Sequence, residues 1–358
     1  MEKETLIDRA KLNHSSILVK IIGAINSQST DDLSLGWGEC GTALFFLYYD
    51  MMFPSEEIGS KAVDIISRIF LRYKNKNLNL DSLDYVNGAM GIIATLEHAN
   101  KHGLLETDVD KFFRDIDDKI YNRILYKKEA SLDIRKGLTG QGIFVLSRTR
   151  NYRYINNFED VRSIDAMISW IDKLGSLFDK KEDACTESFI SEVSSCIILL
   201  SKIVRQGVYP EVSGKLLNRL LSFFDKLIRL DSDQNSLNER IDVLYSYWHV
   251  TSALQFETLT TNPYSRILQL ATLCLNNNVS YENKLEHNIR LAQQLLRLYW
   301  STEKLEYRQT AELLILQSLE LTDPYPSPGI YGYSGLGLLV LSSLSRKCIP
   351  WDEVISLS

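Results

Sequence analysis

The side chains best suited to nucleophilic or metal chemistry in this chain are its five cysteines. They are widely scattered, and none belongs to a Cys-x-x-Cys pair: Cys40, Cys185, Cys196, Cys274 and Cys348. An odd number of thiols without paired spacing is typical of a cytosolic protein that keeps its cysteines reduced and mostly buried. The thiols by themselves therefore indicate no disulfide framework.

Three further side chains could in principle hold a metal through harder ligands. Glu286, His287 and His249 together would offer a carboxylate and two imidazoles, without the softness of a thiolate. Each histidine also has an ordinary structural interpretation. His287 with Asn288 suits the start of a helix, and His249 beside Trp248 suits packing in a core.

The elements that must position these residues are predicted to be helices. Apolar residues recur with a period close to 3.6 along nearly the whole chain, and strand signals are sparse. Three such stripes are Val63, Ile66, Ile69, Phe70 and Tyr73; Met167, Ile171, Leu174 and Phe178; and Leu216, Leu220, Phe223, Phe224 and Leu227. The pattern predicts an all-α fold.

A Gly-x-x-Gly motif followed at once by an apolar helix occurs at residues 38–41, 88–91, 137–140 and 332–335. The first three copies begin 50 and then 49 residues apart, a spacing that suits one helical hairpin per repeat. A first turn without side chains can pack closely on its neighbours, and we expect its free N–H groups to open onto a shared cavity. The alternative is a linear helical solenoid with glycine turns.

Composition and charge exclude several classes of function. With 45% hydrophobic and 24% charged residues the chain reads as globular, and its net charge of −6 with no basic tract argues against nucleic-acid binding. Its apolar runs fall far short of the roughly 20 residues that span a bilayer. The N-terminal residues lack the layout of a signal peptide, so we expect a cytoplasmic protein without membrane insertion.

The repeated glycine openings resemble those of the lanthionine synthetase C family, the cyclases of lanthipeptide biosynthesis. Residues 34–45 are similar to the family's first inner-helix opening and residues 133–140 to its third, and the likeness extends over residues 30–342. The resemblance implies an α/α toroid of about seven inner and seven outer helices. It further implies a single domain over residues 1–358, with an outer helix within residues 1–30.

The resemblance also implies a chemistry. In the family, a zinc ion held by two cysteines and one histidine activates cysteine thiols of a precursor peptide as thiolates. These thiols add to dehydrated serines and threonines, and neighbouring acid–base residues assist. The expected partner is therefore a dehydrated precursor peptide, with a lanthipeptide dehydratase or an intact cyclase as further partners.

The chain departs from this pattern in the fourth to sixth repeats. No glycine lies between Gly214 and Gly329. In the sixth repeat the expected Cys-His-Gly is replaced by residues 286–288, which keep only His287. In the fourth, Ser191 stands where the family has an active-site histidine. We therefore expect no bound zinc and no other cofactor.

The fifth repeat can be aligned in two registers. The preferred one retains Arg240 and Tyr245 of the family's site and places Leu244 at the ligand cysteine. The other aligns Trp248 with the family's tryptophan and His249 with the cysteine. Neither register supplies a thiol.

The resemblance points to a set of candidate site residues. Asp133 matches an aspartate of the family's active site, although it could equally cap the loop before its helix. The candidate catalytic residues are Asp133, His287, Arg240 and Tyr245, and the candidate substrate contacts are Trp37, Asp133, Tyr245 and Tyr331.

Three functions follow from these residues. We favour an accessory protein that binds dehydrated precursor peptide and has lost zinc-dependent cyclisation. A second hypothesis is a zinc-independent cyclase in which Asp133 and His287 act as acid and base while confinement of the peptide supplies the rate. The third is an unrelated α/α toroid acting on carbohydrate or isoprenoid, for which we find no convincing pair of carboxylates.

Overall fold

The regular elements of the described residues are all helices, as the apolar period predicts. The computed structural model describes residues 14–28, 30–75, 82–129, 131–149, 158–181, 187–230, 236–254, 263–276, 284–321, 327–345 and 347–355. Within them, no helix is both long enough and apolar enough to cross a bilayer.

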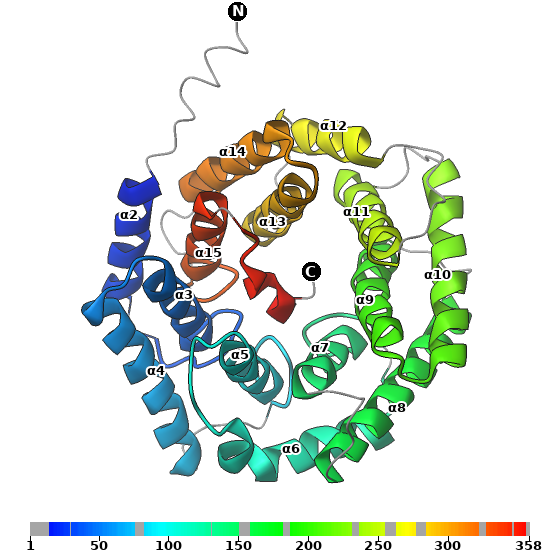
Figure 1. Ribbon diagram of the computed structural model, residues 1–358, viewed down its shortest axis with the longest axis horizontal. Helices are drawn as coiled ribbons and strands as arrows, with labels where there is room; N and C mark the ends of the chain where they lie inside the picture. The colour runs from blue at the N-terminus through cyan, green and yellow to red at the C-terminus, as the bar shows by residue number, and fades with distance from the viewer. Residues whose placement is uncertain are drawn as a thin grey trace, which may run out of the picture. The chain divides into compact units, whose positions relative to one another are not determined.

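The chain divides into two compact units. The first unit comprises Met1–Ser82, His98–Thr107 and Ala271–Asp352, and the second unit Leu83–Glu97, Asp108–Leu270 and Glu353–Ser358. The helices, labelled in Figure 1, are α2 (His14–Ser27), α3 (Glu39–Met52), α4 (Glu56–Lys74), α5 (Ala89–Lys101), α6 (Val109–Tyr126), α7 (Leu138–Arg148), α8 (Phe158–Lys181), α9 (Glu187–Gln206), α10 (Pro210–Leu230), α11 (Leu237–Ala253), α12 (Pro263–Asn276), α13 (Lys284–Thr302), α14 (Leu305–Leu321), α15 (Tyr333–Leu344) and the 3-10 helix η2 (Pro350–Ile355).

Each unit has an inner and an outer layer of helices. In the first unit, α15 packs against both α3 and α13, while α2, α4 and α14 cover this inner layer. In the second unit, α9 packs between α7 and α11, and α8 and α10 form the cover. Consecutive helices such as α3 and α4, or α13 and α14, therefore form inner–outer hairpins, the unit that the repeat spacing predicts.

Burial follows this layering. Inner helix α15 is buried continuously over residues 334–343, whereas outer helix α4 buries a single stripe that includes Ala62, Ile65, Ile66 and Ile69. The prediction that Val63 shares this stripe is wrong, because its side chain is 53% exposed. One residue advances a helix by about 100°, which turns Val63 away from the face that Ala62 occupies.

The four glycine motifs open helices as predicted. Gly38, Gly137 and Gly332 are the N-cap residues of α3, α7 and α15, and α5 begins directly after Gly88. However, the first N–H of α3, α7 and α15 does not open onto a cavity. It donates to a carbonyl of the preceding loop, and the pairs are Glu39 to Asp32 (2.9 Å), Leu138 to Ser131 (3.1 Å) and Tyr333 to Ser327 (3.0 Å).

The second glycine of the first motif allows two loops to meet. Ile330 N–H donates to the Leu35 carbonyl (3.1 Å), and Tyr331 N–H donates to the Gly36 carbonyl (3.0 Å). A Cβ on Gly41 would lie 2.5 Å from the Leu35 carbonyl oxygen and 2.6 Å from Ile330 N. The absence of a side chain at Gly41 therefore lets α3 begin directly against the paired loops.

A similar contact recurs in the second unit. Tyr85 N–H, in the loop before α5, donates to the Arg135 carbonyl in the loop before α7 (2.9 Å). A Cβ on Gly140 would lie 2.5 Å from the Tyr85 Cβ. In each unit, two repeats that keep their glycines are thus joined through the backbones of their loops.

Inner helices without the glycine motif are longer. The helices α9, α11 and α13 have 20, 17 and 19 residues, whereas the glycine-opened α3, α5, α7 and α15 have 14, 13, 11 and 12. Helix α11 begins with an ordinary capping box, in which Ser236 and Glu239 each accept a backbone N–H of the other. Where the glycines are lost, regular helix occupies more of the repeat.

A buried arginine ties α7 to its neighbours in the second unit. Arg148, at the end of α7, donates to Glu97 of α5 and to Asp110 and Asp117 of α6. Burial, followed by the negative charges of Asp110 and Glu97, raises the pKa of Asp117 to about 6, although Arg148 and Arg162 oppose the shift. The cluster holds three carboxylates around one guanidinium.

We predict that Gly41→Ala lowers the free energy of unfolding by about 1–3 kcal/mol or more, because the methyl group would displace the paired loops. The matched control is Gly23→Ala in α2, where an added Cβ meets nothing within 4 Å. Because alanine favours helix there, the control should be neutral or stabilising by up to about 1 kcal/mol. Urea unfolding measures both, and equal effects would contradict the role of Gly41.

We predict that Asp117 makes the protein less stable as the pH rises from about 4 to about 6. Its folded-state pKa of about 6 lies above the ordinary value of 3.8, so the folded state binds the extra proton in this window. The contribution is present below about pH 4 and is lost as the pH passes about 6, a change of roughly 2–3 kcal/mol. Unfolding of the wild type and of Asp117→Asn across this range measures the difference.

The control for this measurement is Asp118→Asn, because the Asp118 side chain is 55% exposed and pairs with Arg162 (2.6 Å). Its pH profile should follow that of the wild type. Parallel profiles for the wild type and Asp117→Asn would contradict the prediction.

Candidate functional site

Two of the predicted substrate contacts lie together in the first unit. The rings of Trp37 and Tyr331 are 5.5 Å apart at an interplanar angle of 51°. The backbone bond from Tyr331 N–H to the Gly36 carbonyl holds the two loops that carry them. Trp37 is partly exposed, whereas Tyr331 is buried, with only 6% of its surface exposed. Within the pair, Trp37 is therefore the more accessible ring.

The Asp133 carboxylate shapes its own loop. Its Oδ1 accepts the N–H groups of Arg135 (2.5 Å) and Lys136 (3.1 Å), and its Oδ2 accepts the Ser131 hydroxyl (3.2 Å). The Asp133 N–H in turn donates to Ser131 Oγ (3.0 Å). This is the local capping geometry that the sequence allows as an alternative to an acid–base role.

Ser191, at the position of the family's histidine, donates its hydroxyl to Asp242 Oδ2 of α11 (2.8 Å). Asp242 is 4% exposed, so this bond satisfies a carboxylate in a buried place between α9 and α11. The bond gives Ser191 a role in holding the two inner helices together.

Glu192 is a titratable group that the sequence reasoning missed. It is half-buried on α9, and burial raises its pKa, with the negative charge of Asp133 as the next cause. Lys181 and a hydrogen bond with the Leu132 backbone oppose this shift. The signal available in the sequence was its place beside Ser191, where an acid–base residue is expected.

Helix α11 carries the residues of the fifth repeat. Tyr245 is completely buried, and its ring lies 5.5 Å from that of Trp248 and 6.0 Å from that of His249. The near-parallel stacking of Tyr245 on His249, at 24°, agrees with the packing interpretation of His249. Arg240 is partly buried in the first turn of the helix, where its N–H donates to the Ser236 carbonyl (3.2 Å).

His287 lies in the first turn of α13 and is partly exposed. The next residue, Asn288, is 8% exposed, and its Nδ2 has no hydrogen-bond partner among the described residues.

The middle of α13 is anchored by Asp352, which is fully buried. Its carboxylate accepts hydrogen bonds from Arg297 Nε (2.7 Å) and Gln293 Nε2 (2.8 Å).

The residues at the matched positions do not fit the family's zinc ion. Leu244 is a core residue of α11, 5% exposed, and offers no ligand atom. Among the described residues, Glu286 and His287 belong to no group of three or more His, Cys, Asp or Glu with ligand atoms within 4.8 Å. In the other register, His249 is engaged in the stacking with Tyr245.

The cysteines that the structure describes belong to no group of three or more metal-ligating side chains. The four that the structure describes are free, and of these Cys40 and Cys196 are buried. Burial raises the pKa of Cys196 to about 12 and that of Cys274 to about 11, so both are thiols rather than thiolates at neutral pH. Cys185 lies outside the described residues.

Comparison with known proteins identifies the scaffold. Residues 29–248, more than half of the chain, match the model of the lanthionine synthetase C-like protein family. Among solved structures, nisin cyclase is similar over 97% of both chains, with a TM-score of 0.62 and 14% sequence identity. A search of curated proteins gave no significant match. These likenesses show that the chain has the α/α toroid fold, and that it belongs to the lanthionine synthetase C-like family.

Proposed function

We propose that this protein binds a dehydrated precursor peptide during lanthipeptide maturation and has lost zinc-dependent cyclisation. The observation that carries the proposal is the replacement of the fourth to sixth glycine openings by the longer helices α9, α11 and α13. At the ligand positions these helices present the buried Leu244 and the lone histidine His287, which provide no thiolate. Family membership supports the peptide as substrate class.

The peptide contact is proposed to lie at the loops that keep their glycines. Trp37 and Tyr331 form their aromatic pair there, and the loop pairing fixes their separation before any peptide arrives. Dehydration removes serine and threonine hydroxyls, so the precursor becomes less polar and better suited to aromatic rings. A lanthipeptide dehydratase or an intact cyclase would then act on the peptide that this protein holds.

We predict that Trp37→Ala weakens binding of a dehydrated precursor about 10-fold, a typical effect of truncating an aromatic anchor. Fluorescence anisotropy of a labelled precursor measures the affinity, and thermal unfolding confirms that the variant is folded. The control is Tyr126→Ala on α6, which removes an aromatic side chain that is 79% exposed. Unchanged affinity in Trp37→Ala would contradict the proposed contact.

A second candidate function is zinc-independent cyclisation, with Asp133 and His287 as acid and base. The proximity of Glu192 to Asp133 favours this candidate, because a carboxyl with a raised pKa can remain protonated closer to neutral pH and donate a proton. The two functions differ in whether the protein alone consumes thiols of the dehydrated precursor.

For the accessory function we predict that all precursor thiols remain free after incubation with this protein, with or without added zinc. Alkylation followed by mass spectrometry counts the free thiols, and an intact cyclase in a parallel reaction is the positive control. Thiol consumption that is lost in both Asp133→Asn and His287→Ala would instead establish the second candidate. Asparagine at position 133 keeps an oxygen that can accept the Arg135 and Lys136 N–H groups, so the variant separates chemistry from folding.

A further inference from the structure

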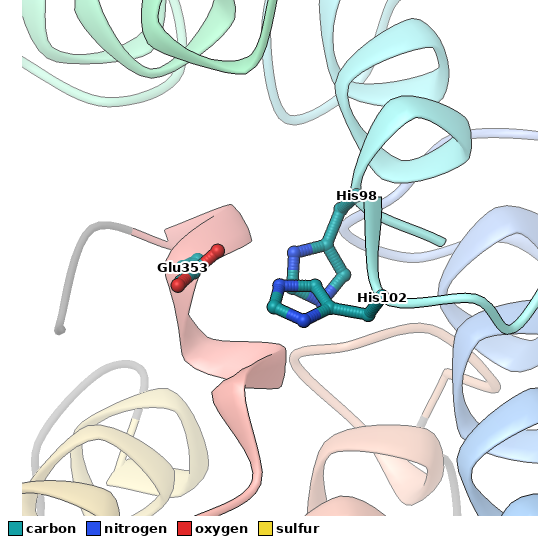
Figure 2. A group of neighbouring side chains, drawn as sticks. All are labelled: His98, His102 and Glu353. Carbon is teal, nitrogen blue, oxygen red and sulfur yellow. The ribbon is translucent and has the colours of Figure 1, made fainter. Parts of the chain in front are cut away.

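Two histidines face each other at the end of α5 in the first unit. His98 and His102 are four residues apart, and the His102 N–H donates to the His98 carbonyl (3.1 Å). Helical geometry therefore continues to His102 and places both imidazoles on one face. Figure 2 shows the two rings side by side, and their centroids are 4.4 Å apart. One ring nitrogen of each lies within 4.8 Å of the other.

The orientation of His98 is set by a buried hydrogen bond. Its Nε2 lies 2.7 Å from the Tyr48 hydroxyl of α3, and both side chains are at most 4% exposed. If Nε2 carries the proton and donates to Tyr48, Nδ1 is the nitrogen through which His98 would bind a metal ion. A hydrogen bond to the second ring nitrogen is the usual support of a metal-binding imidazole.

The backbone that carries His102 is equally well held. Gly103 has a φ of +68°, its N–H donates to the Asn100 carbonyl (3.1 Å), and the Leu104 N–H donates to the Ala99 carbonyl (2.9 Å). These are the two bonds of a Schellman motif, which ends a helix in a defined conformation. The negative end of the helix dipole also favours a cation at this place. His102 is partly exposed, so an ion can reach it from solvent.

We propose that His98 and His102 bind a divalent cation of the zinc, nickel and copper class through one nitrogen each. Imidazole is a preferred ligand of these ions, and two histidines four residues apart on a helix face are a recurrent way to hold them. The site shares no residue with the positions of the family's zinc ligands. It is independent of the proposed peptide function.

The test is calorimetric titration of the chelator-treated full chain with zinc and, separately, nickel. The wild type is expected to bind one ion per chain at this site, and the ion is expected to raise the melting temperature. His102→Ala should weaken binding at least about 10-fold and abolish the thermal shift, because one of the two protein ligands is removed. Tyr48→Phe keeps both ligands and should weaken binding by a smaller factor, up to about 10-fold.

Two other histidines provide matched controls. His14→Ala removes an imidazole that pairs with Ser343 and Glu312, and His287→Ala removes the one that matches the family's ligand. Both variants should bind the ion as the wild type does. Absence of ion binding by the wild type overturns the proposal, as does equally tight binding by His102→Ala. Loss of binding in His287→Ala but not in His102→Ala would assign the ion to the family's position.

Discussion

The glycine-opened helices α3, α7 and α15 depend on a close approach between the start of the helix and a backbone carbonyl of the loop before it. The N–H of Glu39 bonded to the Asp32 carbonyl is one example, and the N–H of Leu138 bonded to the Ser131 carbonyl is another. A buried N–H without a partner costs about 1–3 kcal/mol, so these bonds stabilise a helix start that has no side-chain cap. Because the loop lies so close, the residue at the helix start must lack a Cβ. The motif therefore allows the backbone N–H group at the helix start to find a hydrogen-bond partner. The packing of the loop against the helix in each such repeat follows from this bond.

Much of this could be predicted from sequence because the signals are local. A glycine pair before an apolar run predicts where α3, α5, α7 and α15 begin, and all four begin there. The destination of their first N–H groups could not be predicted in this way, since it depends on how each loop folds back. Val63 is a second example of what a local pattern cannot predict. Its apolar side chain lies beside a buried stripe of α4 but is itself exposed.

The candidate site was likewise predictable from sequence only where the signals are local. The side-by-side placement of Trp37 and Tyr331 depends on a pairing between loops at opposite ends of the chain, which no short-range pattern encodes. The raised pKa of Glu192 arises from burial and from the charge of Asp133 in another repeat. Residue identities indicate the loss of thiolate ligands, but only the structure shows that regular helix has extended over those positions.

The pairing of the first and last loops also bears on how the protein is made. Leu35 and Ile330 meet although nearly 300 residues separate them, and α15 covers α3 in the same unit. At roughly 5–20 residues per second, a ribosome needs about 15–60 s to synthesise the intervening chain. Throughout that time the apolar face of α3, including Phe45, lacks the helix that finally covers it. The first unit therefore completes its folding only after synthesis has passed α15, and until then this face of α3 is exposed apolar surface of the kind that promotes aggregation.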